Sequence, residues 1–250
     1  MRPLVSRRWR CRISAGSVPV TARAAASAAW TLVLDAFYPP RCGGCDRRGI
    51  WLCPDCVSLI NDAPARSEAV PRLAALVCAG AFVGPLREAV HKLKYECDRP
   101  LARPLAGLLS GALERDGSWV DSEGEAPVLV PVPLHASRQR GRGYNQAELI
   151  ARELGVLTGW PVRNGMVRVR DTRSQVGLKP EERAANVRDA FEWRDGRPPA
   201  FAMLVDDVCT TGATLSECAF ALTSAGARRV TAATVARAVS THPDADVYDR

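Results

Sequence analysis

The sequence predicts an α/β protein: a doubly wound, mainly parallel sheet with a small N-terminal module that binds a metal ion through four cysteines. Three observations support this prediction. Apolar runs of strand length alternate with segments of helical spacing over residues 77–236. One of these runs, at residues 201–208, leads into two adjacent aspartates and then a turn rich in threonine and glycine. Two CxxC pairs lie close together at residues 42–56.

Composition fits a globular chain and argues against a general nucleic-acid footprint. The 250 residues are 47% hydrophobic and 24% charged, which suits one ordinary domain with a small addition. The formal net charge is +7, but residues 1–34 contain six arginines and no acidic residue. Removing those six from the 34 basic residues leaves 28 basic against 27 acidic residues. The positive charge is therefore concentrated in the N-terminal segment, and the rest of the chain is nearly neutral.

We expect residues 1–34 to form a basic tail that is disordered or contains one short helix. Residues 24–34 are apolar and rich in alanine, and this run behind the arginines loosely resembles a signal peptide. The run is shorter than the about 20 apolar residues that span a bilayer as a helix, and no convincing cleavage site follows it. We therefore predict a cytoplasmic protein without membrane insertion, with export as the alternative.

The nine cysteines indicate one metal site. Cys42, Cys45, Cys53 and Cys56 form two CxxC pairs seven residues apart, and the other five are scattered. An odd count with clustered pairs favours a reducing compartment over a disulfide framework. We expect residues 35–60 to hold a structural Zn²⁺, because four thiolates close a tetrahedral site; a redox pair and an iron–sulfur site are the alternatives. Removing the metal should unfold residues 42–56 and spare the ligand site of the main domain.

The domain proper is expected over residues 77–240, after a polar linker at residues 61–76 that contains two prolines. Its elements are predicted in this order: strand 77–83, a helix from Pro85, helix 100–114, strand 127–132, helix 147–157, strand 201–208, helix 213–224 and strand 229–236. Pro85 suits the first turn of a helix, which needs no N–H there. A short apolar run between prolines, at residues 127–132, suits a buried parallel strand.

The later elements follow from spacing and from a stop signal. Leu149, Ile150 and Leu154 lie on one side of a helix. Gly226 follows the next predicted helix and is a typical C-terminal cap. The polar residues 241–250 are expected to form a frayed tail.

The segment MLVDDVCTTGATL, at residues 203–215, carries the clearest functional signal. A turn followed by a helix N-terminus directs unpaired backbone N–H groups at one point, where a phosphate is favoured. Gly212 allows close approach of the backbone, because it has no Cβ. Thr210, Thr211 and Thr214 add hydroxyl donors.

Asp206 and Asp207 would repel a phosphate if they served no other group. They fit if they accept hydrogen bonds from ribose hydroxyls, directly or through a bound Mg²⁺. The alternative is an acid-capped helix start in which both carboxylates only complete hydrogen bonds. Cys209 lies in the same loop, and we interpret it as a small space-filling residue. A catalytic thiol needs a base, and none of the three histidines lies near it in the sequence.

Arg138, Arg140 and Arg142 form a basic loop after the strand at residues 127–132. Arginine suits bidentate phosphate contacts, and the carboxyl edge of a parallel strand is where such sheets bind ligands. We interpret this loop as a contact to pyrophosphate or to a nucleic-acid backbone; the alternative is a solvated loop. Tyr144, which follows, either stacks on a base or packs.

Two further segments have a functional and an ordinary interpretation. Residues 168–191 are polar and charged, and such a stretch can order over a ligand as a lid. We assign Arg183 and Asn186 to that lid, because they lie three apart on one helical face; the alternative is an exposed charged helix. Lys92 and Lys94 either add to a basic ligand surface or simply end an amphipathic helix.

Residues 203–215 closely resemble the signature with which type I phosphoribosyltransferases bind phosphoribosyl pyrophosphate (PRPP). With four other segments, they make the chain resemble the ComF family, phosphoribosyltransferase-like proteins linked to DNA uptake in natural competence. These segments are HKLKY at 91–95, PVPLH at 131–135, RGRGYNQAELIA at 140–151, and SQVGL with ERAANV at 174–187. The resemblance covers residues 36–238, and Ser174 stands where the family has a proline.

The resemblance implies a type I phosphoribosyltransferase-like fold, a zinc finger and Mg²⁺-dependent phosphoribosyl transfer from PRPP. Asp206 and Asp207 would be catalytic residues that hold the ribose hydroxyls. The 5′-phosphate would be bound by Cys209, Thr210, Thr211, Gly212, Ala213 and Thr214. The implied partners are PRPP, single-stranded DNA, and a competence helicase or other DNA-processing proteins. The alternative is a non-catalytic module that senses PRPP and binds single-stranded DNA, although 6% aromatic residues is few for a stacking platform.

Overall fold

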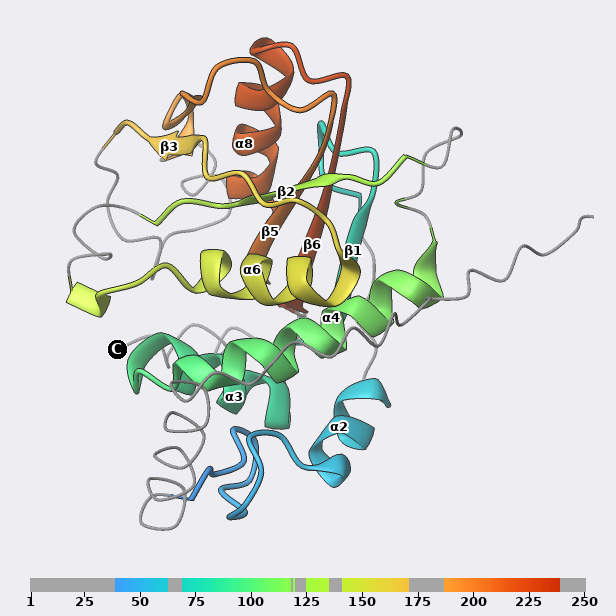
Figure 1. Cartoon of the computed structure of the whole chain (residues 1–250), viewed down its shortest axis with the longest axis vertical. Coiled ribbons are helices and arrows are strands. Elements are labelled where there is room, and N and C mark those ends of the chain that lie inside the picture. The colour runs from blue at the N-terminus through green and yellow to red at the C-terminus, as the bar shows by residue number, and fades with distance from the viewer. Residues whose placement is uncertain are drawn as a thin grey trace, which may run out of the picture. The chain divides into compact units, whose positions relative to one another are not determined.

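Four strands form the main sheet (Figure 1). Their spatial order is β1 (Leu76–Ala81), β6 (Arg229–Arg237), β5 (Phe201–Cys209) and β2 (Val128–Pro131). Each neighbouring pair is parallel, and Leu204 of β5 lies level with Val130 of β2 and Ala232 of β6. The computed structural model describes residues 39–62, 69–117, 119, 125–134, 141–170 and 187–238. The predicted fold class, a mainly parallel α/β sheet, is confirmed.

Helices cover both faces of this sheet (Figure 1). They are α3 (Gly84–Tyr95), α4 (Ala102–Asp116), α6 (Gln146–Thr158) and α8 (Ala213–Ser224). Met203 and Val205 of β5 belong to the core that also contains the buried residues of α3 and α4, whereas Ala202 and Leu204 belong to the core beneath α8. Side chains alternate between the faces of a strand, so this division continues to the end of β5.

The central strands are apolar on both faces because both faces are covered. The first five residues of β5 are all buried, and so are the last eight of β6. Continuous apolar runs of this kind are typical of parallel strands between helical layers. The alternation of strand and helix patterns in the sequence was therefore a reliable guide to the layers.

Most predicted elements are present, and no end is shifted by more than two residues. Helix α8 has the predicted bounds, and Gly226, which follows it, has a φ of +111°. The predicted helix at 100–114 is a 3₁₀ turn, Arg99–Leu101, that continues as α4. Three elements were not predicted: α2 (Pro54–Asn61) and the antiparallel pair β3 (Met166–Arg168) and β4 (Phe191–Trp193).

Residues 40–250 form one compact unit, and the other unit, Met1–Pro39, lies almost entirely outside the described residues, as do residues 241–250. Val70 lies in the segment predicted as a linker and is buried in the core beneath α8. The division into tails, module, linker and domain stays a prediction. Within the described ranges, no helix combines the length and apolar character needed to cross a membrane.

Candidate functional site

The two aspartates lie within the last four residues of β5, on opposite faces of the sheet. On the face of α3, the side chain of Asp207 is 11% exposed, and its Oδ1 lies 3.1 Å from the Nζ of Lys94. On the other face, Arg168 of β3 acts electrostatically on Asp206. The backbone N–H of Asp207 donates to Oδ1 of Asp206 at 2.8 Å. The pair is therefore enclosed by cations from two different elements.

The surroundings of the two aspartates shift the pKa values of Asp206 and of the neighbouring Lys94. Burial raises the pKa of Asp206 to about 8, and the adjacent Asp207 carboxylate adds to this rise; the Asp207 N–H, Lys94 and Arg168 act in the opposite direction. Burial lowers the pKa of Lys94, but the Asp207 carboxylate outweighs it, and the net direction is upward. At neutral pH, Asp206 is thus mainly protonated and Lys94 is charged. A carboxylic acid beside a carboxylate can both donate to and accept from hydroxyl groups.

The loop after β5 presents hydroxyl and backbone donors. Thr210 and Thr211 are exposed, and the helix that follows begins with Ala213 and Thr214, both half-buried. The Ala213 N–H donates to Oγ1 of Thr211 at 3.4 Å. The N-cap of α8 is Gly212, which has no side chain to cap the first turn. This loop and helix start have the arrangement that favours an anion.

Gly212 has a packing role in this loop. Its φ is +79°, which favours glycine, and a Cβ placed on it would lie 2.6 Å from Cγ2 of Val70. The side chain of Val70 fills the space where a Cβ would lie, so the glycine serves the packing of the loop. Close approach of the Gly212 backbone to a ligand stays a prediction.

Cys209 is buried beneath the loop. Its Sγ accepts a hydrogen bond from Nη1 of Arg237, the last residue of β6, at 2.6 Å. Burial raises the pKa of the thiol to about 12, although Arg237 opposes the rise. A protonated, buried thiol is a poor nucleophile, which fits the interpretation of Cys209 as a space-filling residue.

The described part of the basic loop packs against α3. The guanidinium of Arg142 lies 4.7 Å from the ring centroid of Tyr95, the last residue of that helix. The Tyr144 hydroxyl donates to the Leu93 carbonyl, and the guanidinium of Arg99 lies 4.6 Å from the Tyr144 ring. Tyr144 therefore packs rather than offering a free ring. Arg138 and Arg140 lie outside the described residues, as do the lid residues Arg183 and Asn186.

Two polar residues, Asn145 and Gln146, open α6, and no functional role was predicted for them. Asn145 accepts from the Ala147 N–H, and its Nδ2 donates to the Val132 carbonyl at 2.9 Å. This contact fixes the start of the helix against the end of β2. Gln146 is fully buried, and neither of its amide atoms has a hydrogen-bond partner among the residues that the structure describes. The signal was a polar pair directly after the basic loop, where an apolar helix face should begin.

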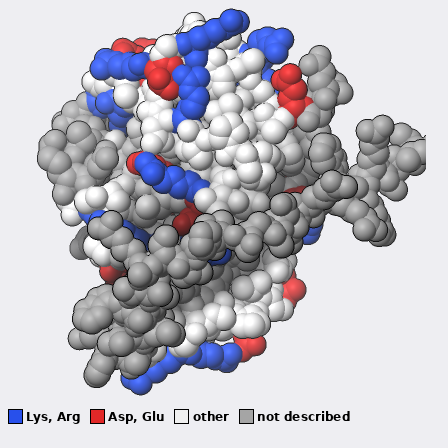
Figure 2. Space-filling model, viewed as in Figure 1, with Lys and Arg blue, Asp and Glu red and all other residues white. Residues whose placement is uncertain are grey.

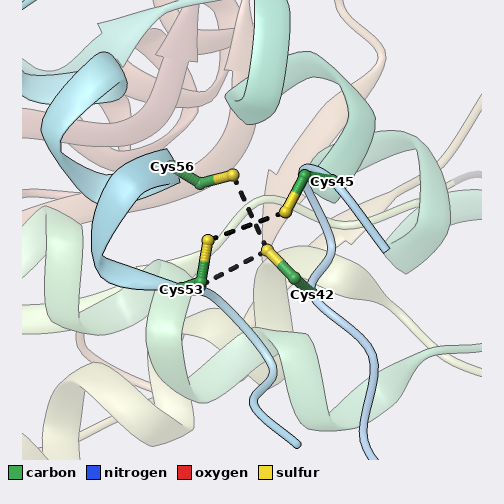
Figure 3. A group of neighbouring side chains, drawn as sticks. All are labelled: Cys42, Cys45, Cys53 and Cys56. Atoms are coloured by element: carbon green, nitrogen blue, oxygen red, sulfur yellow. Dashed lines mark hydrogen bonds between the residues drawn. The ribbon is translucent and has the colours of Figure 1, made fainter. Parts of the chain in front are cut away.

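The four predicted cysteines meet at one point (Figure 3). Cys42 and Cys45 come from a loop, and Cys53 and Cys56 flank the start of α2. The Sγ atoms are 3.7 Å apart in one pair, Cys42 and Cys56, and 3.6 Å apart in the other. A tetrahedral Zn²⁺ with Zn–S bonds of about 2.3 Å would separate its sulfurs by about 3.8 Å. The cluster therefore fits a structural metal such as zinc.

The module also prepares a thiolate. Burial raises the pKa of Cys42, but the backbone N–H groups of Cys53, Cys45 and Gly44 outweigh it and lower the pKa to about 6. The Cys53 N–H lies 3.3 Å from the Cys42 Sγ. Metal ligation needs the thiolate form, so backbone geometry already favours the ligand state of this cysteine.

Charge on the surface is mixed. On the face in Figure 2, basic and acidic groups lie interspersed, and the described residues there form no continuous basic patch. This agrees with the near balance of charge outside residues 1–34.

The parallel sheet with helices on both faces and the four-cysteine cluster define an α/β protein with a small module suited to a structural metal. Competence protein F of Haemophilus influenzae is 31% identical to the chain over 203 residues, covering 80% of this chain and 85% of that protein. The chain belongs to the competence protein F (ComF) family.

Other relatives agree. DNA utilization protein YhgH of Escherichia coli (strain K12) is 29% identical, over 76% of this chain and 85% of that protein. Competence protein ComFC of Bacillus subtilis (strain 168) is 33% identical over 35% of each chain. No family model matches the chain. A crystal structure of a Thermus thermophilus protein, at 20% identity, covers 57% of this chain and 84% of that chain; its TM-score of 0.32 is too low to support an inference.

Proposed function

We propose that this protein binds PRPP together with Mg²⁺ at the end of β5 and transfers its phosphoribosyl group, and that it acts in the uptake or use of DNA. The observation that carries the proposal is the segment 206–214: two enclosed carboxyl groups, then exposed threonines, then a helix whose N-cap residue is glycine. The names of two relatives, competence protein F and DNA utilization protein YhgH, support the proposed role in the uptake or use of DNA.

Each part of the segment has a role in this proposal. Asp206 and Asp207 bind the ribose hydroxyls, and the protonated Asp206 can donate as well as accept. The loop from Cys209 to Thr214 binds the 5′-phosphate through backbone N–H groups and the hydroxyls of Thr210 and Thr211. Carboxylate oxygens are ligands that suit Mg²⁺, which when bound with PRPP neutralises charge on the pyrophosphate.

The reaction is a direct displacement at C1′ of the ribose. The bond from C1′ to the pyrophosphate oxygen breaks, and the pyrophosphate leaves with the electron pair. The acceptor forms the new bond to C1′ and loses a proton to solvent. Direct attack by the acceptor is consistent with the state of Cys209, whose thiol is buried and protonated. Arg142 and the rest of the basic loop bind the leaving group.

Calorimetric titration with PRPP, with and without Mg²⁺, tests the site. The double variant Asp206→Asn/Asp207→Asn should lose metal-dependent binding, because amides neither carry the charge nor supply the carboxylate oxygens. Glu88→Gln is the matched control, since Glu88 is an exposed acid on α3. Unchanged affinity in the double variant would refute the assignment. If the wild-type protein binds, pyrophosphate release with ammonia and with nucleobases tests transfer.

A second candidate, a module that senses PRPP and binds single-stranded DNA, is favoured by one observation. Tyr95 is 44% exposed, and its ring lies near both the His91 ring and the Arg142 guanidinium. Exposed aromatic rings beside cations are typical of sites where bases stack. Fluorescence anisotropy with a labelled oligo-dT should show weaker binding by Tyr95→Ala. Phe220→Ala is the matched control, because Phe220 is also 44% exposed with an arginine over its ring. Equal affinity in both variants would remove this candidate.

A further inference from the structure

The last turn of α3 makes polar contacts in two directions. Lys92 and Lys94 are two residues apart, and residues at that spacing project about 200° apart around a helix. Lys92 reaches the cysteine module, and Lys94 reaches the acidic pair. Neither side chain is free in solvent: they are 13% and 20% exposed. One rigid element therefore contacts both the metal cluster and the proposed ligand site.

The contact with the module involves its first CxxC pair. The Nζ of Lys92 forms an ion pair with Asp46 and lies 3.4 Å from the carbonyl oxygen of Cys42. The backbone packs closely as well. A Cβ added to Gly43 would lie 3.0 Å from Cβ of Ala89 in α3, and one added to Gly44 would lie 2.7 Å from Cβ of Pro85. The ligand loop thus rests directly on the helix, and a change in its shape must move one of the two.

The contact with the acidic pair is an ion pair in a poorly hydrated place. Lys94 Nζ lies 3.1 Å from Asp207 Oδ1, and the Asp207 side chain is 11% exposed. The carboxyl group of Asp206 is linked to the backbone of Asp207, whose N–H donates to it. A buried carboxylate without its cation is energetically unfavourable, so the side chain is expected to rotate toward another partner or toward solvent. The direction of the Asp207 carboxyl group therefore depends on Lys94, and the Asp206 carboxyl group is held by the backbone N–H of Asp207.

Between the two lysines, α3 is anchored. Leu93 is fully buried, and its carbonyl accepts the hydroxyl of Tyr144. Leu86, Ala89 and Val90 are also buried in the same core as Cys42. The helix is thus packed on one side by the core and tied on the others by the two lysines.

We propose that Lys94 is a positioning residue for the Asp206–Asp207 pair. We further propose that the metal-loaded cysteine module fixes the position of Lys94, because Lys92 ties α3 to that module. The proposal rests on the proposed function, because PRPP is the ligand whose affinity reports the position of the pair. It also changes an expectation from the sequence, in which loss of the metal spared the ligand site. A disordered first CxxC pair would release Lys92, and the last turn of α3 would lose one of its two ties.

Two measurements test the proposal. The first is PRPP affinity in the presence of Mg²⁺ for Lys94→Met, Lys94→Arg and Lys92→Met. Losing a charge-assisted contact that positions two ligand groups should weaken binding about tenfold or more in Lys94→Met. Lys94→Arg should recover part of this loss, since it keeps the charge. Lys92→Met should weaken binding in the same direction without touching a thiol or a carboxyl group.

The second measurement is amide hydrogen exchange of residues 206–212 without PRPP. Lys92→Met should speed exchange there as well as at residues 42–56. Arg47→Ala is the matched control: it breaks an ion pair with Asp55 within the module, but both side chains are more than half exposed and neither forms a described contact with α3. This variant should leave PRPP affinity and exchange at 206–212 unchanged.

The outcomes separate cleanly. Wild-type affinity in Lys94→Met would refute the positioning role. Faster exchange confined to residues 42–56 in Lys92→Met would refute the coupling, even if Lys94→Met failed to fold. A wild-type protein that does not bind PRPP would overturn the proposed function instead, and the exchange measurement would still decide the coupling.

Discussion

The ionised carboxylate of Asp206 is less stable in the folded protein than it would be in water. Its pKa rises from 3.8 to about 8 through burial and through the neighbouring Asp207. A group whose pKa is higher in the folded state stabilises the fold below its unfolded pKa, and this contribution is lost as pH rises through the folded pKa. The acidic pair therefore opposes folding at the pH where its proposed ligand would bind.

Replacing Asp206 with Asn should remove this opposition. We expect the wild-type free energy of unfolding to fall by at least about 1 kcal/mol relative to Asp206→Asn between pH 5 and pH 8. Urea unfolding at both pH values measures the difference, with Glu88→Gln as the control that should run parallel to the wild type. Parallel pH profiles for wild type and Asp206→Asn would show that the carboxyl group is not held in its protonated form.

Residue-level prediction from sequence succeeded where neighbours in the chain are neighbours in space. The adjacency of Asp206 and Asp207, and the meeting of two CxxC pairs, are local properties. Lys94 was noticed but given two interpretations, because its partner lies more than a hundred residues away and only the fold brings them together. Gln146 was given no functional role for the opposite reason: its polarity at a buried position contradicts the helix pattern around it.

At the scale of elements, two glycines have opposite effects on stability. Gly107 lies in the exposed middle of α4, and a Cβ there would meet nothing within 4 Å. Gly212 has a φ of +79° and would drive a Cβ into Val70. The first is a weak point in a helix, and the second is a requirement of the loop.

Alanine substitutions should therefore change stability in opposite directions. Gly107→Ala should raise the free energy of unfolding by about 0.5–1 kcal/mol, because alanine favours a helix interior. Gly212→Ala should lower it by at least about 1 kcal/mol, since the left-handed conformation alone costs that much. Chemical denaturation of the two single variants is sufficient. A neutral effect of Gly212→Ala would mean that the loop adapts and that Val70 gives way.

The longer helices and strands were predicted from the sequence, and the shortest strands were not. The strands and helices with several apolar positions in period were found with nearly correct ends, because tertiary packing agrees with their local pattern. β3 and β4 have three residues each, which is too short for any period to be read. Their pairing is antiparallel and separate from the main sheet, so no alternation rule predicts it either.

At the scale of the whole molecule, the cysteine module shares a core with the sheet. Cys42, Cys53 and Cys56 are buried in the same cluster as Leu86 and Leu105. A small metal module that stood alone would unfold by itself when its metal was removed. Because the module packs in a common core, its unfolding should lower the stability of the rest of residues 40–250.

Removing the metal should accordingly destabilise more than the module. In scanning calorimetry, protein treated with a strong chelator should show a lower midpoint for its main transition than metal-loaded protein. Cys78→Ser is a control for general thiol effects, since Cys78 lies in β1 and outside the cluster. An unchanged main transition, with a separate small one lost, would show that the module and the sheet unfold independently.

The order of strands has a consequence for how the chain is made. β6, last of the four along the chain, lies between β1 and β5, so β1 has no partner within the sheet until β6 exists. Chains emerge from the ribosome N-terminus first, and contacts this distant in sequence form slowly. β1 must therefore wait for residues 229–237, whereas β2 and β5 can already pair with each other. A chain cut before residue 229 would contain the whole acidic segment and would lack the strand that lies between β1 and β5.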